Sequence, residues 1–231
     1  MNPVSAPPRL RAVTAPASLR KRVVESLREA IIAGHFLPGA RLVERELCEL
    51  LGVSRTSIRE ALVELESEGL IQNIPNRGPV VARISPKMAE DVYQLRASLE
   101  GLAAQLFARR ATDEQVAALV QATTALEEVY RNFASGPFLA AKNHFYDVLL
   151  GGAGNELAAQ VLRGVHARVS QLRVTSLSDP SRSEKSIREI WRIVEAIRAR
   201  DEKAALAASI EHVENAAHAA LAVLAAKKDP E

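Results

Sequence analysis

Six consecutive residues carry the densest group of nucleic-acid chemistry in the chain. Ser54–Arg59 reads Ser-Arg-Thr-Ser-Ile-Arg and holds two arginines and three hydroxyls. Ser54 is a favourable N-cap, since its hydroxyl can accept a backbone N–H that the first helical turn leaves unpaired. Arginine side chains and short hydroxyls beside a helix N-terminus suit phosphate groups and guanine edges. The segment therefore predicts the start of a DNA recognition helix.

The residues around this segment indicate how it is held. The recognition helix has an apolar face at helical spacing, formed by Ile58, Ala61, Leu62 and Leu65, and Gly69 ends it. A helix is expected over 18–33, and a short one over 43–51 that Gly52 ends. Between them, Pro38-Gly39 has the signature of a type II turn. The short helix at 43–51 and the recognition helix that Ser54 starts, joined by the tight turn at Gly52, form a helix-turn-helix.

A β-hairpin is predicted directly after the recognition helix. Leu70-Ile71 and Pro79–Ala82 are the expected strands, joined by the turn residues of Asn73–Gly78. A helix-turn-helix followed by a hairpin is a winged helix, with Arg77 and Gly78 at the wing tip, where they can enter a DNA groove. The other interpretation is an ordinary hairpin that carries one solvated arginine.

Composition places few limits on function but agrees with a DNA-binding domain at the N-terminus. The chain has 231 residues, and 48% of them are hydrophobic, enough for substantial cores. Up to residue 85 there are 12 Lys+Arg against 9 Asp+Glu, and beyond it 18 against 19. The single cysteine, Cys48, rules out an internal disulfide and fits a reducing compartment, so we expect a cytoplasmic protein with no membrane segment. The proline-rich residues 1–17 are expected to be a disordered tail.

The remainder of the chain is helical in period. Ser85-Pro86 marks a domain boundary, because the residue before proline avoids the helical region. Thr112 and Gln115 form a capping box at the start of a helix. Gly136-Pro137 is expected to separate that helix from the next one. The fold class predicted is mostly α: a winged helix-turn-helix domain over 18–84, then an antiparallel bundle of about six helices over 85–228. The bundle helices are expected at about 88–110, 112–133, 138–150, 155–177, 183–200 and 202–226.

Residues 19–82 resemble the DNA-binding domain of the GntR family of bacterial transcription regulators. The matching stretches are LREAIIAGHFLPGARL (27–42), ERELCELLGVSR (44–55) and REALxxLxxEGL (59–70). Many members have Pro-Val where this chain has Ser57-Ile58. The resemblance, together with the chemistry above, implies a set of DNA contacts, which we do not divide between bases and phosphates: Arg45, Ser54, Arg55, Thr56, Ser57, Arg59, Arg77 and Gly78.

Residues 86–226 resemble the FCD effector domain, which identifies the chain with the FadR-like branch of that family. The resemblance rests on LRxxLExxAA (95–104), Phe145 ahead of Gly154-Asn155, AIxxxD (196–201) and His212. Most members of the branch bind a divalent metal in the bundle. Here Lys142, Tyr146 and Ile190 stand at three of the four ligand positions, and His212 alone matches. One imidazole beside a lysine does not make a zinc site, so no metal and no other cofactor is expected.

The same substitutions suggest a metal-free site for a small organic acid. Lys142 and Tyr146 are four residues apart and share the inward helix face. The ammonium of Lys142 would neutralise a carboxylate, Tyr146 and His212 would donate hydrogen bonds, and Arg96 would form a bidentate contact. Two alternatives stay open: Arg96 pairs with Glu100 one turn on, and the small residues around His212 serve close helix packing rather than a cavity.

These features predict a DNA-binding transcription regulator, and we expect a repressor because ligand-relieved repression is the common mode in the family. One recognition helix reads few base pairs, so we expect a homodimer on a palindromic operator, with DNA affinity modulated by the acid through the helix at 88–110. The alternative is a repressor whose helical domain only dimerises and senses no ligand. No nucleophile and base converge in the sequence, so no enzymatic activity is expected.

Overall fold

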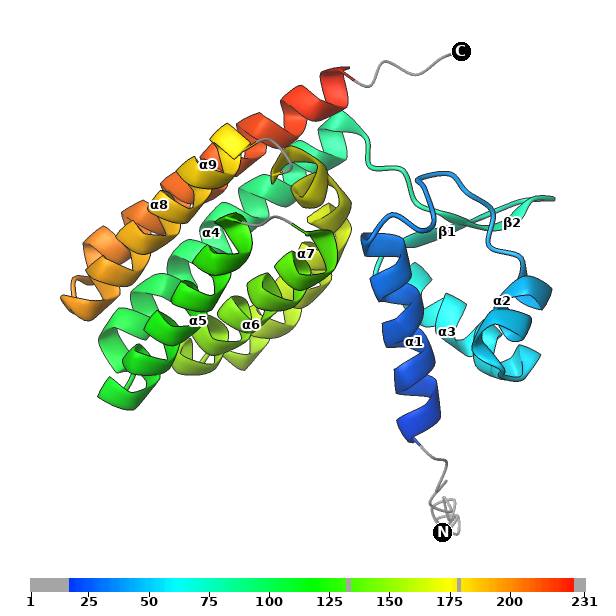
Figure 1. The fold of residues 1–231 in the computed structure, drawn as a ribbon, viewed down its shortest axis with the longest axis horizontal. Helices are drawn as coiled ribbons and strands as arrows, with labels where there is room; N and C mark the ends of the chain where they lie inside the picture. The colour runs from blue at the N-terminus through cyan, green and yellow to red at the C-terminus, as the bar shows by residue number, and fades with distance from the viewer. Residues whose placement is uncertain (1–16, 132–133, 178–179, 227–231) are drawn as a thin grey trace, which may run out of the picture.

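The computed structural model describes residues 17–131, 134–177 and 180–226, which form two bodies joined through one short connection (Figure 1). The predicted tail therefore lies outside the described residues, apart from Ala17. The N-terminal body contains three helices and a hairpin: α1 (Ala17–Ile32), α2 (Glu44–Leu51), α3 (Arg55–Ser67), β1 (Ile71–Ile74) and β2 (Gly78–Val81). The C-terminal body is helical: α4 (Pro86–Arg110), α5 (Asp113–Arg131), α6 (Ser135–Ala153), α7 (Glu156–Leu177), α8 (Pro180–Arg198) and α9 (Glu202–Ala226). The predicted fold class is confirmed.

Both predicted glycine turns of the N-terminal body form, the one before α2 and the one between α2 and α3. The N–H of Ala40 donates to the carbonyl of Leu37 (2.9 Å), and Gly39 has φ +85°, as a type II turn requires. Gly52 ends α2 in the left-handed conformation (φ +63°). Buried aliphatic side chains of α1, α2 and α3 then close one core, which includes Val24, Leu27, Leu47, Ile58 and Leu65.

The wing is longer than predicted. Its strands pair antiparallel from Ile71↔Val81 to Ile74↔Gly78, whereas the turn residues of the sequence place the start of the connecting loop at Asn73. Only Pro75–Arg77 lie between the strands, and Asn76 supplies the left-handed residue (φ +64°) that reverses the chain. Because the turn takes only these three residues, Asn73 and Ile74 pair with β2 as part of strand β1.

Helix α4 is the centre of the bundle and packs against α6, α7, α8 and α9. Its approach to α9 is close at Gly101, where an added methyl group would lie 2.9 Å from Cδ1 of Leu206. Ala205 and Ser209 of α9 are buried as well. At this point it is the glycine of α4 that leaves room for the large side chains Leu206 and Ile210 of α9.

Helix α6 extends three residues beyond its predicted range at each end, because two glycine motifs expected to lie between helices lie within it. Gly136-Pro137 does not interrupt the chain but lies in the first turn of α6, where proline needs no intrahelical N–H partner. At the other end α6 continues through Gly151-Gly152 to Ala153, and Gly154 (φ +63°) ends it. The position of Gly152 within the helix has no room for a side chain, because an added methyl group would lie 2.2 Å from the ring of Phe107.

The remaining helix ends agree with the sequence to within a few residues. Ser85 caps α4 by accepting the N–H of Met88 (3.1 Å). The capping box of α5 is present in both directions: Gln115 accepts the N–H of Thr112 (2.8 Å), and Thr112 accepts that of Gln115 (3.3 Å). Helix α8 begins at Pro180, three residues earlier than predicted. Within the described ranges, each helix is too short or too polar to cross a membrane.

Candidate DNA interface and effector site

The N-terminus of α3 is capped by a side chain and exposed. The hydroxyl of Ser54 accepts the N–H of Ser57 at 3.2 Å, and the two hydroxyl oxygens lie 3.1 Å apart. Arg55 and Thr56, in the same first turn, are exposed. A capped helix end with exposed arginine and hydroxyl groups can bind phosphate oxygens.

Arg59, one turn along α3, is held by α2. Its Nε lies 2.9 Å from both carboxylate oxygens of Glu44, while 66% of the arginine side chain remains exposed. This pair raises the pKa of Arg59, first through the hydrogen bond to Glu44 and then through its charge. Arg45, on α2, is exposed as well and lies 4.0 Å from Glu49. The surface formed by α2 and α3 thus carries exposed arginines, and these two each lie beside an acidic side chain.

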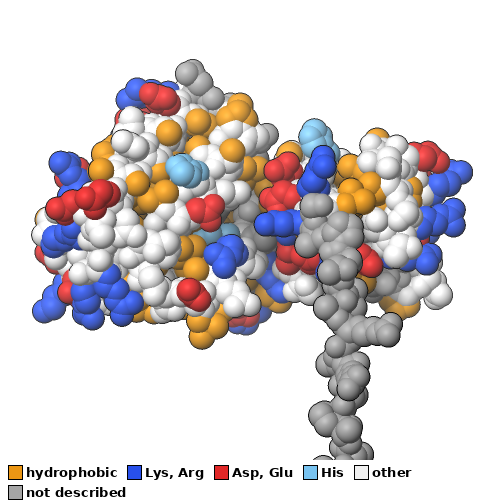
Figure 2. All heavy atoms as spheres, turned by 90° about the horizontal axis from the view of Figure 1, so that it is seen from below, with side chains coloured by type: hydrophobic (Ala, Val, Ile, Leu, Met, Phe, Trp, Pro, Cys, Tyr) orange, Lys and Arg blue, Asp and Glu red, His pale blue; other side chains and the backbone are white. Residues whose placement is uncertain are grey.

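Arg77 is not extended from the wing tip. Its Nη2 donates to the carbonyl of Gly39 at 3.1 Å, which folds the side chain back onto the turn before α2. Gly78 begins β2 with φ +81°. Figure 2, the view from below Figure 1, shows acidic and basic side chains interspersed on both bodies. The eight predicted DNA contacts remain predictions, and of these Arg77 would have to leave its present partner.

A buried polar cluster in the bundle has Glu100 at its centre. The carboxylate accepts hydrogen bonds from Nε of Arg96 (2.7 Å) and from the hydroxyl of Tyr146 (2.8 Å), and it lies 2.8 Å from Nε2 of His166. Arg96 and Glu100 are 1% and 2% exposed. Burial alone would raise the pKa of Glu100, but the charges of Arg96 and His166 hold it well below its usual range. Glu100 is therefore ionised.

Two cations lie beside Tyr146 in this cluster, one near its ring and one near its hydroxyl. The ammonium of Lys142 lies 5.0 Å from the ring centroid, and Nη2 of Arg96 is 3.4 Å from the hydroxyl. Lys142 is 2% exposed. Nη1 of Arg96 is buried and has no hydrogen-bond acceptor among the described residues. Arg96 thus pairs with Glu100, which is one of the alternatives left open by the sequence. Its Nη1 remains available as a hydrogen-bond donor.

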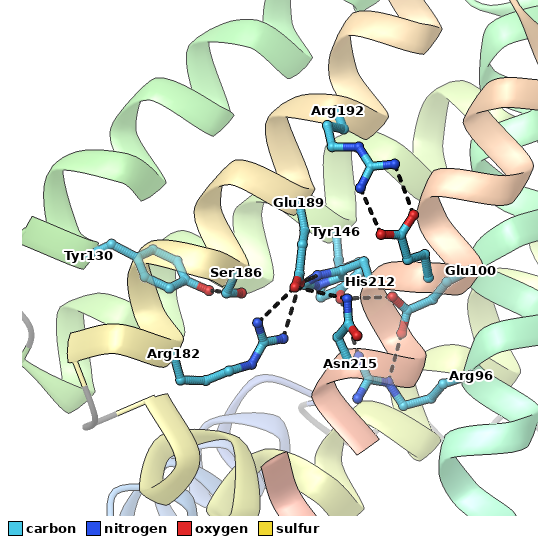
Figure 3. Close-up of polar contacts among 11 residues, drawn as sticks. Arg96, Glu100, Tyr130, Tyr146, Arg182, Ser186, Glu189, Arg192, His212 and Asn215 are labelled. Carbon is cyan, nitrogen blue, oxygen red and sulfur yellow. Dashed lines mark hydrogen bonds and ion pairs between the residues drawn. The ribbon is translucent and has the colours of Figure 1, made fainter. Parts of the chain in front are cut away.

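His212 takes part in a second, partly buried network, centred on Glu189 (Figure 3). Its Nδ1 lies 2.8 Å from the carboxylate, which also accepts two hydrogen bonds from Arg182 (3.0 and 3.1 Å) and one from Asn215 (3.1 Å). Burial lowers the pKa of His212 to about 4. Burial acts to raise the pKa of Glu189, but its hydrogen bonds from His212 and Arg182 bring it to about 2. At neutral pH a neutral imidazole therefore donates to a carboxylate.

The structure brings the four predicted effector residues to one region but also supplies them with partners that sequence reasoning missed. Glu100 and Glu189 are the acceptors at the two centres. His166 of α7 meets Glu100 of α4, a partner that helical spacing does not reveal. Ile190, at a position where relatives carry a metal ligand, is fully buried in the apolar core. In the described ranges no three His, Cys, Asp or Glu side chains gather as a metal would need.

Comparison with known proteins gives two family matches. Residues 19–81 match the profile described as bacterial regulatory proteins, gntR family, and residues 91–215 match the FCD domain. The HTH-type transcriptional regulator YdhC of Bacillus subtilis (strain 168) is 28% identical, over 78% of this chain and 80% of the relative. The HTH-type transcriptional repressor RspR of Escherichia coli (strain K12) is 27% identical, over 85% and 86%. Among solved structures, E. coli McbR/YncC has a TM-score of 0.79 at 20% identity, covering 93% of this chain and all of that one (100%), which is a likeness of fold.

Proposed function

Because this chain belongs to the GntR family of bacterial regulatory proteins and carries an FCD domain, we propose that it is a repressor that binds a palindromic operator as a homodimer and responds to a small organic acid. DNA-binding transcription regulation follows from the family. Repression, dimeric binding and acid sensing are our proposals. The name of the relative RspR supports repression. We also propose a cytoplasmic location, where such a protein meets DNA.

The proposed DNA interface is the exposed surface of α2, α3 and the wing. Its contacts are those predicted from the sequence: Arg45, Ser54, Arg55, Thr56, Ser57, Arg59, Arg77 and Gly78. Each chain has one recognition helix among its described residues, and one such helix reads few base pairs. Two copies related by a dyad would read two half-sites, which is the reason for proposing a homodimer.

In vitro selection from a random duplex library tests the dimeric part of the proposal. The expected product is an inverted repeat whose half-site centres lie about 10 base pairs, one helical turn, apart or a multiple of it. Arg55→Ala should abolish enrichment, while Arg188→Ala, at an exposed position on helix α8, should not. Enrichment of a lone half-site or a direct repeat would contradict the palindromic arrangement.

The effector proposal rests on one observation: Nη1 of Arg96 is a fully buried donor with no acceptor in the described structure. Leaving such a group unsatisfied is costly, particularly when it is charged. A carboxylate placed between Arg96 and Lys142 would accept that hydrogen bond and would add a negative charge beside two cations. Tyr146 and His212 border the same region and are proposed to orient the acid.

One observation favours the alternative, a bundle that only dimerises. The carboxylate of Glu100 already satisfies Nε of Arg96 and the Tyr146 hydroxyl, so much of the cluster is complete without a ligand. The close contact of α4 with α9 at Gly101 points the same way. An acid would then have no room in the bundle, and DNA binding would not depend on it.

A thermal-shift screen with mono- and dicarboxylic acids, sugar acids and amino acids, run with and without chelator, separates the two. An acid at 100 times its dissociation constant adds about 2.7 kcal/mol to the free energy of unfolding. The shift should persist with chelator, disappear in Lys142→Leu and remain in Lys203→Leu, an exposed lysine on α9. An unchanged shift in Lys142→Leu would refute the site, and no shift with any acid would support the dimeriser.

A further inference from the structure

A hollow lies where the two bodies meet, away from the polar clusters of the bundle. It has a volume of about 220 Å³ and is bordered by the end of α3, the hairpin, the connection to α4 and helix α7. In Figure 1, α7 is the bundle helix that runs beside α1, and residues of these two helices are in contact. At about 30 Å³ per water molecule, the volume corresponds to roughly seven waters, enough for a compact organic molecule.

The lining of the hollow is apolar with a cationic margin. Its apolar side chains include Ile31, Leu70, Ile71, Val81, Ile84 and Met88. The charged side chains are two arginines, Arg83 and Arg168. None of the described residues that line it is acidic. A molecule that fits would have an apolar body and a negative charge.

Arg168 is the cation best placed to bind that charge. It is half-buried on α7, and its guanidinium lies over Gly69, where an added methyl group would come within 2.4 Å of the guanidinium carbon. Within the described ranges, Arg168 makes no hydrogen bond or ion pair. The nearby carboxylates of α3 are already engaged: Glu64 by Arg20, Glu66 by the N–H of Asn73, and Glu68 by Arg28. A partly desolvated guanidinium without an acceptor is a binding group for carboxylate.

We propose that this hollow, which we call the joint site, binds a compact monocarboxylate, with its carboxylate on Arg168 and its apolar body among Leu70, Ile84 and Met88. The joint site is separate from the proposed effector site in the bundle and does not depend on it. A ligand in the joint site contacts the bundle and also Leu70, the residue directly after Gly69 at the end of the recognition helix. The ligand can therefore favour one relative placement of the two bodies, and with it one spacing of recognition helices.

Helix α7 gives the joint site a connection to the bundle interior. His166 and Arg168 are two residues apart and so project from nearly opposite faces of the helix. His166 contacts Glu100 in the polar cluster, whereas Arg168 contacts the surface of Gly69. A shift of α7 would move both contacts together.

The methionines make the joint site directly observable. The chain has two, Met1 and Met88, and Met88 lines the hollow. We would label the full-length protein with ¹³C at the methionine methyl groups and titrate it with benzoate, with straight-chain acids from butanoate to octanoate, and with benzamide as the uncharged match to benzoate. A saturable shift of the Met88 resonance is expected with at least one acid, and with at least tenfold weaker affinity for benzamide than for benzoate where benzoate binds.

Three variants decide the assignment. Arg168→Leu should abolish the saturable shift, and Arg163→Leu, an exposed arginine on the same helix, should keep it. Lys142→Leu should keep it too, so failure of the bundle site would not be mistaken for failure of this one. As a further check, Ala82→Leu, which fills the hollow from the connection side, should weaken binding even if Arg168→Leu folds poorly. The proposal is overturned if no acid shifts Met88, if Arg168→Leu binds as tightly as the parent, or if Lys142→Leu removes the response.

Discussion

The buried pair of Arg96 and Glu100 should be coupled far more strongly than any exposed ion pair of the same chain. We would measure this with a double-mutant cycle of Arg96→Met, Glu100→Gln and the double variant. Each single change leaves one charge nearly fully buried without its partner, which typically costs about 3–5 kcal/mol of the free energy of unfolding. The double variant removes both charges, and the side-chain amide oxygen introduced by Glu100→Gln still accepts from Tyr146. Its cost should therefore fall below the sum of the single costs, by about 2–3 kcal/mol.

Urea unfolding followed by tryptophan fluorescence suits this measurement. Trp191 is the only tryptophan, and it lies on α8 within the bundle, where its Nε1 donates to Glu127 at 2.9 Å. All variants must be compared at one protein concentration, because dimerisation would make stability depend on it. The matched control is a cycle on Arg109 and Glu202, a pair 2.9 Å apart at the surface of the same bundle. Water screens that pair, so its coupling should be close to experimental error.

The reasoning fails if the two cycles give the same coupling. It also fails if the double variant costs as much as the single changes combined. Either result would mean that Glu100 stabilises the bundle only through shape and neutral hydrogen bonds. The charge of Arg96 would then have no bearing on an acid in the bundle.

Two further predictions concern stability. The pKa of His212 is about 4 in the folded protein against an ordinary 6.5, so the unfolded chain takes up a proton first as pH falls. The free energy of unfolding should therefore fall by roughly 3 kcal/mol between pH 6.5 and 4 because of this residue. His212→Gln should remove that part of the pH dependence in urea titrations at pH 7, 5 and 4. Equal slopes in both proteins would contradict it. The adjacent glycines of α6 should respond in opposite directions: Gly152→Ala should cost about 1–3 kcal/mol by crowding Phe107, whereas Gly151→Ala, which meets no atom within 4 Å, should stabilise by up to about 1 kcal/mol. Thermal unfolding of the two variants compares them directly, and a loss in both would show that crowding is not the cause.

The local features of the fold could be predicted from the sequence because their causes lie within a few residues. The Ser54 cap, the turn at Pro38-Gly39 and the box of Thr112 and Gln115 are each set by neighbouring side chains. The prediction for the start of α6 is wrong because Gly136-Pro137 has two outcomes, a break or a first turn, and neighbouring residues do not decide between them. The contact that leaves no room for a side chain at Gly152 is likewise with a residue far away in the sequence, Phe107.

The candidate site was harder to predict because its partners come from different helices. His166 meets Glu100 across 66 residues, and His212 meets Glu189 across 23. Helical spacing reveals pairs three or four residues apart, such as Arg96 and Glu100, and is silent about the others. An acidic residue on a helix of the bundle interior was the one available signal, since an ionised carboxylate in a core requires cationic or hydrogen-bonding partners.

In the pair of Arg59 and Glu44, the carboxylate of Glu44 competes with DNA for the guanidinium of Arg59. The carboxylate of Glu44 occupies Nε of Arg59, so a phosphate that binds this nitrogen has to displace Glu44 first. A cognate duplex, which offers many simultaneous contacts, compensates for this displacement, while an arbitrary duplex offers fewer and does so less well. The pair would therefore lower the affinity for arbitrary DNA more than the affinity for the operator. The ratio of operator affinity to arbitrary-DNA affinity would rise, although both affinities would be lower. In a cell where arbitrary duplex is in vast excess, that ratio decides how much of the protein is found at its target.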